Sequence, residues 1–513
     1  MAGKVAGKGT HCCLSSLSAC KHGPFNSPRT ALIDSLDDDS LLNVFYVYRR
    51  FFLGNGDDSA RFKGRVAETW WYHLIHVCQR WRTVILRSAS YLGLSLVCTK
   101  GTRVAYMLAN SPSLPLVIDY AQEYCGIPEK DEQQAFIALK QRGRVRRISI
   151  ELSIINLKKL VVALEGEYPI LEHLTIRHQI KDNTTSLTLP ETFEAPHLRH
   201  LTLVGFALPI GSRLLATAVH LVTLSLLMNS PSTHFQPITL LQWLSSMPQL
   251  ETLIINFIIP ASIRDEKRQL THSSVMTPVT LPNLRYFWFQ GHGSYLEALV
   301  HRITPCPEKL GIRLSDEGTL SFPRLVQFIK TAENLKFESV KFKFSDLRVY
   351  MSVYRCGEAE ICALSMDIGG RDLDWQASWL EQISNLFAQI FSSVERLTLE
   401  FGIVINFWPD EQPNFGLDRI EWRQLLGSFG NVKTLLIDDG LAEEVSRCLQ
   451  LDDGEFRFDL LPELQELTYY SGSGLSDGTS NAFTPFIDAR QKAGRPITLT
   501  TLLKIHDSMT ILM

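Results

Sequence analysis

The sequence of 513 residues lacks the features that mark several large classes of protein. Its ten cysteines include no Cys-x-x-Cys pair, which argues against a disulfide framework and a conventional structural zinc site. The formal net charge is only -3, so no excess of one sign favours nucleic acid or an anionic membrane as a partner. The most apolar stretch, residues 198–228, is interrupted by proline, arginine and histidine. Its uncharged pieces are shorter than the roughly 20 residues of a transmembrane helix.

Catalytic signatures are also scarce. Neither a Gly-x4-Gly-Lys-Ser/Thr phosphate loop nor a His-Glu-x-x-His metal motif occurs. Residues 474–478 do match Gly-x-Ser-x-Gly, with Ser476 as nucleophile and Asp488 and His506 following in the order of an α/β-hydrolase. That motif needs a strand ending at the serine, whereas the preceding Ser-Gly-Ser-Gly has the composition of a flexible loop. We therefore predict an exposed loop, no catalytic residue and no cofactor.

Two further clusters favour structural rather than chemical interpretations. Residues 1–30 are rich in Gly, Ser and Lys and predict a disordered tail. The tail contains potential metal ligands, but adjacent cysteines suit no structural zinc site, and we predict no metal there. Arg144, Arg146 and Arg147 predict a solvated strand edge rather than a phosphate or nucleic-acid site. The potential ligands of the tail are His11, Cys12, Cys13, Cys20 and His22.

From about residue 91 to the end, a short unit of the form Leu-x-x-Leu-x-Leu recurs, usually after a proline or small residue. Its first apolar positions include Leu171, Leu198, Leu221, Leu250 and Leu284, so the intervals are 27, 23, 29 and 34 residues. Later copies occupy residues 393–399, 431–437 and 462–469, and residues 306–367 keep only a divergent pattern. These intervals are typical of leucine-rich repeats lengthened by insertions.

Each copy predicts a short strand, because alternate residues such as Leu174 and Ile176 are apolar. Between copies lie helical patterns such as residues 238–244, which would cover one side of the strands. A single unit cannot bury its apolar face, so neighbouring units must stack. The predicted fold class is therefore α/β, with residues 91–513 forming an irregular leucine-rich-repeat solenoid, or horseshoe.

Outward-facing strand residues are the candidates for binding a protein target, because they would line the concave surface of such a solenoid. Trp288 stands out, since an exposed aromatic residue is a common hot spot of interfaces. The alternative is that Trp288 packs against a neighbouring strand or an insertion. The target-binding candidates are Arg177, Asn256, Trp288, Gln290, Glu400, Asp438 and Tyr470.

Residues 31–90 predict a small domain of three helices. One helix is expected over residues 37–50, with acidic residues in its first turn, where the helix dipole favours them. A second is expected to begin near Val66, and a third spans about residues 79–88. Apolar residues at three- and four-residue intervals, such as Leu74, Val77 and Trp81, indicate one buried helix face.

These helices, with the run Val77-Cys78-x-x-Trp81 and the segments 94–98 and 114–118 after it, resemble the F-box, and more narrowly the F-box-like proteins of mushroom-forming fungi. The resemblance implies the substrate-recognition subunit of a cullin–RING ubiquitin ligase, located in cytoplasm or nucleus. Its partners would be a Skp-type adaptor, a cullin and a protein target, while other subunits carry out ubiquitin transfer. The adaptor-binding positions implied are Leu36, Leu41, Leu42, Val44, Phe45, Leu74, Val77, Cys78 and Trp81.

The chain departs from the family at one position, because Leu36 is followed by Asp37 where F-boxes have proline. Proline presets the first helical turn, and aspartate can cap the helix instead. The main alternative is a leucine-rich-repeat interaction scaffold with a degenerate F-box that joins no ligase, the helices merely closing the end of the solenoid. A hydrolase built around Ser476 is the other alternative.

Overall fold

The structure is a computed structural model, and its residues form two compact units, Met1–Leu94 and Ser95–Met513. Each unit is described by itself. Within them the structure describes residues 35–53, 69–120, 128–152, 154–178, 187–209, 211–228, 234–257, 278–314, 322–331, 337–345, 348–355, 362–369, 379, 382–383, 386–389, 391–401, 419–450, 460–471 and 482–503. The tail with its histidines and cysteines, the second helix expected near Val66, and Ser476 and His506 all lie outside the described residues.

The first unit contains four described helices: α1 (Asp38–Leu53), α3 (Trp71–Leu74), α4 (Gln79–Arg87) and α5 (Ala89–Leu92). Leu41 and Phe45 lie one turn apart on α1 and are each 1% exposed, so this side of the helix forms the core. Helix α5 ends at Gly93, whose φ of 60° is the left-handed conformation that favours glycine after a helix. The predicted helices at residues 37–50 and 79–88 are present with small shifts at their ends.

The second unit is built on a sheet that has 16 strands within the described residues. From one edge to the other the order is β1-β2-β3-β4-β6-β8-β9-β11-β13-β16-β15-β14-β17-β18-β19-β20. Two small strand pairs accompany it, β5 (Leu187–Thr188) with β7 (Phe206–Ala207) and β10 (Val279–Thr280) with β12 (Ile303–Thr304). The sheet strands are β1 (Leu96–Cys98), β2 (Leu116–Tyr120), β3 (Val145–Leu152), β4 (His173–His178), β6 (His200–Val204), β8 (Thr223–Met228), β9 (Thr252–Phe257), β11 (Tyr286–Gly291), β13 (Lys309–Leu314), β14 (Phe337–Ser345), β15 (Arg348–Arg355), β16 (Cys362–Gly369), β17 (Arg396–Phe401), β18 (Thr434–Asp438), β19 (Glu466–Ser471) and β20 (Thr498–Leu503).

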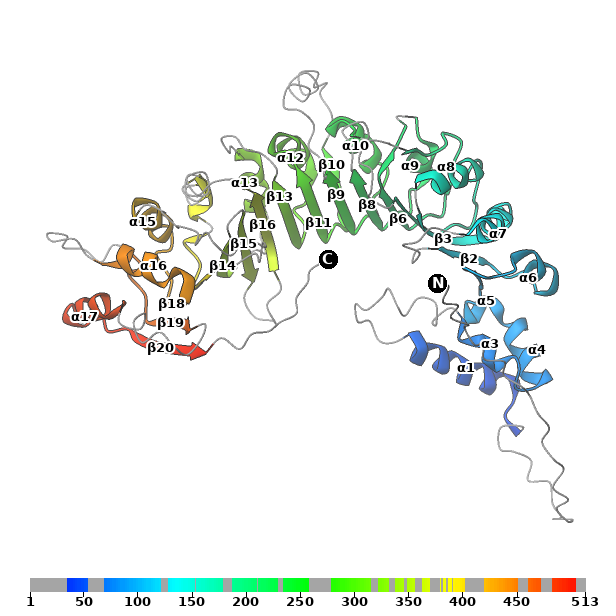
Figure 1. The fold of residues 1–513 in the computed structure, drawn as a ribbon, viewed down its shortest axis with the longest axis horizontal. Helices are drawn as coiled ribbons and strands as arrows, with labels where there is room; N and C mark the ends of the chain where they lie inside the picture. The colour runs from blue at the N-terminus through cyan, green and yellow to red at the C-terminus, as the bar shows by residue number, and fades with distance from the viewer. Residues whose placement is uncertain are drawn as a thin grey trace, which may run out of the picture. The chain divides into compact units, whose positions relative to one another are not determined.

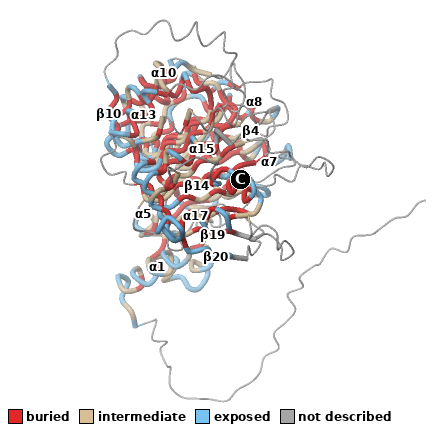
Figure 2. The backbone as a smooth tube through the Cα atoms, turned by 90° about the vertical axis from the view of Figure 1, so that its left-hand side faces the viewer, coloured by how far each residue is buried: buried red, intermediate tan, exposed pale blue. Residues whose placement is uncertain are grey.

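The strands are joined by helices that lie along one side of the sheet, as Figure 1 shows. In Figure 2 the buried residues run through the strands of this unit. Among the described residues no helix has the length and apolar character needed to cross a membrane. The helices are α6 (Val104–Asn110), α7 (Glu129–Leu139), α8 (Ile154–Ala163), α9 (Arg213–Thr217), α10 (Pro237–Leu244), α12 (Gly293–Val300), α13 (Pro323–Lys330), α15 (Arg419–Gly427), α16 (Ala442–Leu449) and α17 (Thr484–Lys492).

The recurring leucines form one row across the sheet. Leu174, Leu201, Leu224 and Leu253 are register partners on β4, β6, β8 and β9, and Phe287 continues the row on β11. All five side chains are 0% exposed. Each copy of the motif therefore supplies one parallel strand, and the copies bury their apolar faces by stacking, as the prediction of a leucine-rich-repeat solenoid requires.

The divergent middle of the array has a different topology. β13 pairs in parallel with β16, and β16, β15 and β14 then pair antiparallel before β14 pairs in parallel with β17. β15 thus runs against the other sheet strands. This meander explains why residues 306–367 keep apolar alternation but lose the repeat motif, since antiparallel neighbours need no helical crossover between them.

Candidate interaction surfaces

The side of the sheet away from the helices is open to solvent. In β4, β9 and β11 every second residue is half-exposed while its neighbours are buried. We call the surface formed by these outward residues the open face. One row across it consists of register partners on consecutive strands, from Thr175 through Thr202, Ser225 and Ile254 to Trp288. Side chains from five separate repeats are thereby brought into contact distance, although they are far apart in sequence.

Most of the predicted target-binding residues lie on the open face. Two of them contain a buried polar atom without a hydrogen-bond partner in the described structure, Nε of Arg177 and Oδ1 of Asn256. Buried polar atoms without partners are costly, so both side chains carry a polar atom that folding leaves unsatisfied. The half-exposed members of the set are Arg177, Asn256, Trp288, Gln290 and Glu400.

Asp438 is not exposed on the open face, contrary to its prediction as a target-binding residue. It faces outward in the alternation of β18, but it is only 5% exposed. The reason is that β18 ends at Asp438 and the chain turns at once into the short 3-10 helix Asp439–Leu441. Its register partner on β19 is Tyr470, the last of the predicted residues. Ser225 is also buried, because its small side chain lies between those of two neighbouring strands.

Trp288 packs on a glycine of the neighbouring strand. Its register partner on β13 is Gly311, and a Cβ atom built on that glycine would lie 2.1 Å from Cε3 of the indole ring. The ring therefore covers backbone rather than standing free. Of the two alternatives weighed for Trp288, packing against a neighbouring strand is what the geometry shows, while the half-exposed ring remains on the open face.

Ion pairs cross the open face where the sheet changes direction. Asp367 on β16, 5% exposed, accepts hydrogen bonds from Arg313 on one side and Arg348 on the other, the latter at 3.2 Å. Lys341 Nζ on β14 lies 2.6 Å from Glu400 Oε1 on β17. The pair between Arg348 and Asp367 links the reversed strand β15 to its neighbour β16.

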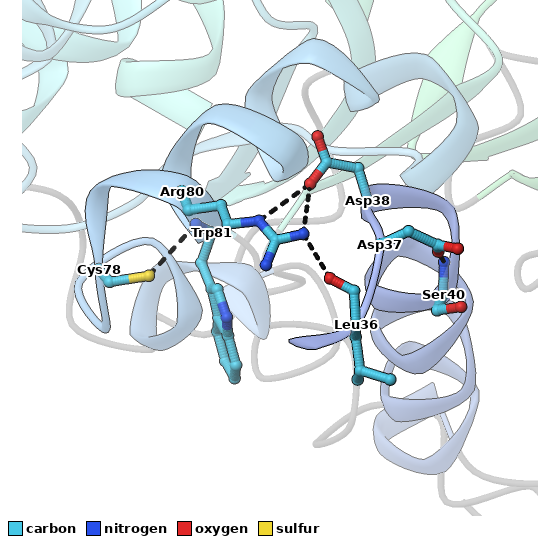
Figure 3. A network of polar contacts seen from close by, with 7 residues as sticks. All are labelled: Leu36, Asp37, Asp38, Ser40, Cys78, Arg80 and Trp81. Carbon is cyan, nitrogen blue, oxygen red and sulfur yellow. Dashed lines mark hydrogen bonds and ion pairs between the residues drawn. The ribbon is translucent and has the colours of Figure 1, made fainter. Parts of the chain in front are cut away.

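The start of α1 in the helical unit is capped by Asp37, whose Oδ1 accepts a hydrogen bond of 2.7 Å from the backbone N–H of Ser40 (Figure 3). This bond, followed by one from the Ser40 side chain, lowers the pKa of Asp37. Arg80 on α4 binds the same turn, donating to Asp38 at 2.8 Å and to the carbonyl of Leu36 at 2.5 Å. Asp37 therefore caps the start of this helix, as an aspartate at that position can.

The start of α4 depends on Cys78 and Trp81 of the Val-Cys-x-x-Trp run. Cys78 precedes the helix in an extended conformation, and its Sγ accepts a hydrogen bond of 3.5 Å from the N–H of Trp81 (Figure 3). The indole of Trp81 meets the ring of Phe45 edge-on, with centroids 4.9 Å apart. The run therefore joins α4 to α1 within this unit.

The predicted adaptor-binding residues divide into core and surface. Leu41 and Phe45 form the core, whereas Val44 and Val77 are 51% and 58% exposed. Sequence reasoning missed Val47, which is 65% exposed one turn after Val44. The 44–47 spacing could have revealed this apolar pair on the outer side of α1. The remaining members are Leu36, Leu42, Leu74 and Trp81, which are half-exposed, and Cys78, which is exposed.

The described residues hold no group of three or more His, Cys, Asp or Glu side chains arranged for a metal ion. The cysteines at positions 78, 98, 306, 362 and 448 are free thiols. The candidate surfaces are built from sheet residues in one unit and helix residues in the other.

The comparisons with known proteins do not establish a family for this chain. No protein-family model matches the chain, and no curated protein matches it. Among solved structures, a leucine-rich-repeat-containing protein from Legionella pneumophila, LegL7, is similar at 10% sequence identity with a TM-score of 0.27. The match covers 77% of this chain and 97% of that one. The assignment of leucine-rich repeats to this chain therefore depends on its own motif spacing and strand register.

Proposed function

We propose that the repeat unit is a non-catalytic scaffold that binds a protein through the open face. The observation that supports this most is the row of outward side chains drawn from successive repeats. Between β4 and β13 there are five inter-strand steps of about 4.8 Å, or about 24 Å of continuous surface. That width suits a standard protein interface, which buries about 800 Å² on each partner.

The polar character of the open face favours a specific partner over non-specific apolar association. Arg177, Asn256 and Gln290 are half-exposed polar side chains on this face, and Gln290 lies beside Asn256 in register. A partner that hydrogen-bonds to these side chains gains more than one that leaves them buried and unpaired. Specificity would then come from these residues, with Trp288 supplying apolar contact area.

The test compares two variants of the full chain, each with three substitutions to glutamate, by co-purification from the cells that express the protein. Arg177→Glu with Gln290→Glu and Lys343→Glu changes the open face, while Lys130→Glu with Lys158→Glu and Arg324→Glu changes exposed positions on the helices. We expect the first variant to lose the proteins that co-purify with the wild type, and the second to retain them. Loss by the helix variant alone would move the interface to the other side of the sheet.

A second function is favoured by the apolar pair Val44 and Val47, which α1 presents to solvent. We propose that this side of α1 binds a Skp-type adaptor, so that the scaffold serves as the substrate-recognition subunit of a cullin–RING ligase. The resemblance of the helices to the F-box and the cap at Asp37 support this proposal. In such a complex the chain would act by proximity, raising the effective concentration of a target lysine near the ubiquitin donor.

Co-purification with a Skp-type adaptor tests the second function, and the choice of variant matters. Leu41→Asp would place a charge in the core and unfold the unit, so Val47→Asp is used instead. Val162→Asp is a matched control, because Val162 on α8 is 66% exposed against 65% for Val47. We expect the adaptor to bind the wild type and Val162→Asp but not Val47→Asp. If the adaptor co-purified with none of these three proteins, the second function would be rejected and only the scaffold function would remain.

A further inference from the structure

The turns that lead into β4, β6 and β8 line an open surface pocket of about 340 Å³. Three lining residues, Ile170, His197 and His220, each precede the first leucine of a repeat motif, and Glu172 and Arg199 follow it. Successive turns are tied together by the backbone, with the N–H of Arg199 donating to the carbonyl of Glu172 at 2.8 Å. The rings of His197 and His220 stack with centroids 6.1 Å apart and planes 6° apart.

Positive charge in this pocket is only partly neutralised. Glu172 is engaged by Arg146, whose Nε lies 3.0 Å from its Oε2. The guanidinium of Arg199 has neither a hydrogen bond nor an ion pair to any residue that the structure describes. The backbone of the next turn pairs Arg199 with Val222, so its next neighbour in this row is uncharged. Arg199 is therefore an exposed arginine at the pocket with no direct ion-pair partner among the described residues.

Strand residues beside the pocket continue onto the open face with one arginine and two stacked histidines. Arg147, His173 and His200 are register partners on β3, β4 and β6. The two histidine rings stack at 4.4 Å, and His200 Nδ1 is hydrogen-bonded to Thr223 Oγ1 at 3.1 Å. Burial, and then the neighbouring His200, Arg147, Arg146 and Arg199, lowers the pKa of His173 to about 4. Three arginines, Arg146, Arg147 and Arg199, therefore lie near this pair of histidines.

We propose that this pocket binds a phosphate monoester group, with Arg199 as the charged contact and His197 and His220 as the flanking donors. Arginine binds two oxygens of a phosphate at once. A tetrahedral group also leaves oxygens for the imidazoles of His197 and His220, which a planar carboxylate offers less well. Resting on the proposed scaffold function, the group would be carried by the protein bound on the adjoining open face.

The pocket fits this ligand better than two alternatives. A metal ion is disfavoured, because His197, His220 and Glu172 do not form a metal-ligand group among the described residues. An extended nucleic-acid backbone is disfavoured by the net charge of -3 and by acidic residues in the same row of turns, Glu172 and Glu251. The proposed ligand is a single anionic group held by side chains from two consecutive repeats.

The test is calorimetric titration of the full chain at constant ionic strength, set with potassium chloride. The probes are inorganic phosphate and O-phosphoserine blocked at both termini. Arg199→Gln should weaken binding of either probe about tenfold or more, since a hydrogen bond to a charged group is being lost. Arg285→Gln is the matched control, because Arg285 holds the same position in a later repeat, is exposed and does not line the pocket.

The outcomes separate cleanly. Saturable binding that weakens in Arg199→Gln and not in Arg285→Gln supports the site, and His220→Gln should then weaken it as well. Tighter binding of blocked phosphoserine than of inorganic phosphate assigns the group to a phosphorylated protein, and the reverse assigns it to free phosphate. No saturation with either probe, or equal weakening in both arginine variants, overturns the proposal. The co-purification test of the open face uses other residues, so it can succeed or fail independently.

Discussion

The indole ring of Trp288 on β11 lies directly over Gly311, its register partner on β13. The close approach is possible because glycine has no side chain. It places the largest aromatic residue of the open face in a fixed position between two repeats. A tryptophan held in this way can offer contact area to a partner with little further loss of side-chain freedom on binding.

We predict that Gly311→Ala destabilises the repeat unit. A Cβ atom at this position would meet Cε3 of Trp288 at 2.1 Å, so the ring must move, at a cost of about 1–3 kcal/mol in the free energy of unfolding. Gly369→Ala on β16 is the control, because a Cβ there meets nothing within 4 Å. Urea unfolding followed by tryptophan fluorescence measures both. Equal midpoints for the two variants would show that the ring is not confined by Gly311.

A second prediction concerns the cap of α1. Asp37→Ala removes the acceptor of the Ser40 N–H, so the amide hydrogen of Ser40 should exchange faster, whereas Asp37→Asn keeps an acceptor and should change little. Because its pKa is lowered on folding, the wild-type cap should persist as pH falls below 3.8 and weaken only as the folded carboxyl becomes protonated. Hydrogen exchange of Ser40 across this range measures the effect. Unchanged exchange in Asp37→Ala would contradict the cap.

The third prediction is a pH dependence of the stacked histidines. His173 takes up a proton near pH 6.5 in the unfolded chain but only near about 4 in the folded one. The unfolded state therefore binds more protons between these values, and stability falls as pH drops from 6.5 towards 4. The groups that face His173 are His200, Arg146, Arg147 and Arg199.

His173→Gln should reduce this loss of stability, measured as the difference in urea midpoint between pH 7 and pH 4.5. His301→Gln, at an exposed histidine just after α12, should retain the wild-type pH dependence. If the urea midpoint changed equally between pH 7 and pH 4.5 in all three proteins, protonation of His173 would not be coupled to unfolding.

The fourth prediction concerns the ion pairs around the reversed strand. Asp367→Asn keeps the shape of a buried residue but leaves Arg313 and Arg348 without a counter-charge, which should cost about 1–3 kcal/mol. Glu400→Gln removes the more exposed pair with Lys341 and should cost less than about 1 kcal/mol. Thermal or urea unfolding of the two variants ranks them. A Glu400 effect as large as that of Asp367 would contradict the importance of burial here.

The leucine motif predicted the repeat strands because alternation and spacing are both local properties of the sequence. The copies at Leu171, Leu198, Leu221 and Leu250 each became the strand that follows, with the leucines aligned in one buried row. The reversed strand β15 could not be predicted in this way. Parallel and antiparallel strands share the same alternation of inward and outward residues, so periodicity does not reveal direction.

The candidate surfaces depended on information that is not local. The pocket residues His197 and His220 are 23 positions apart and meet only because successive repeats stack in register. Their equivalent place before the first leucine of each motif was the signal available in the sequence. Hydrophobicity does not distinguish Val47 from Phe45, because packing against α4 and α5 decides which side of α1 is buried. Asp438 faces outward as the alternation predicts, but the turn that follows β18 buries it.

The most direct test of the interaction scaffold is a lysine-acylation footprint of the full chain, alone and with a protein that co-purifies with it. Lys309 and Lys343 are exposed on sheet strands β13 and β14, and Lys130 and Lys158 are exposed on helices α7 and α8. We predict that the partner reduces acylation of Lys309 and Lys343 and leaves Lys130 and Lys158 unchanged. Protection of the two helix lysines with unchanged labelling of the two sheet lysines would contradict binding through the open face.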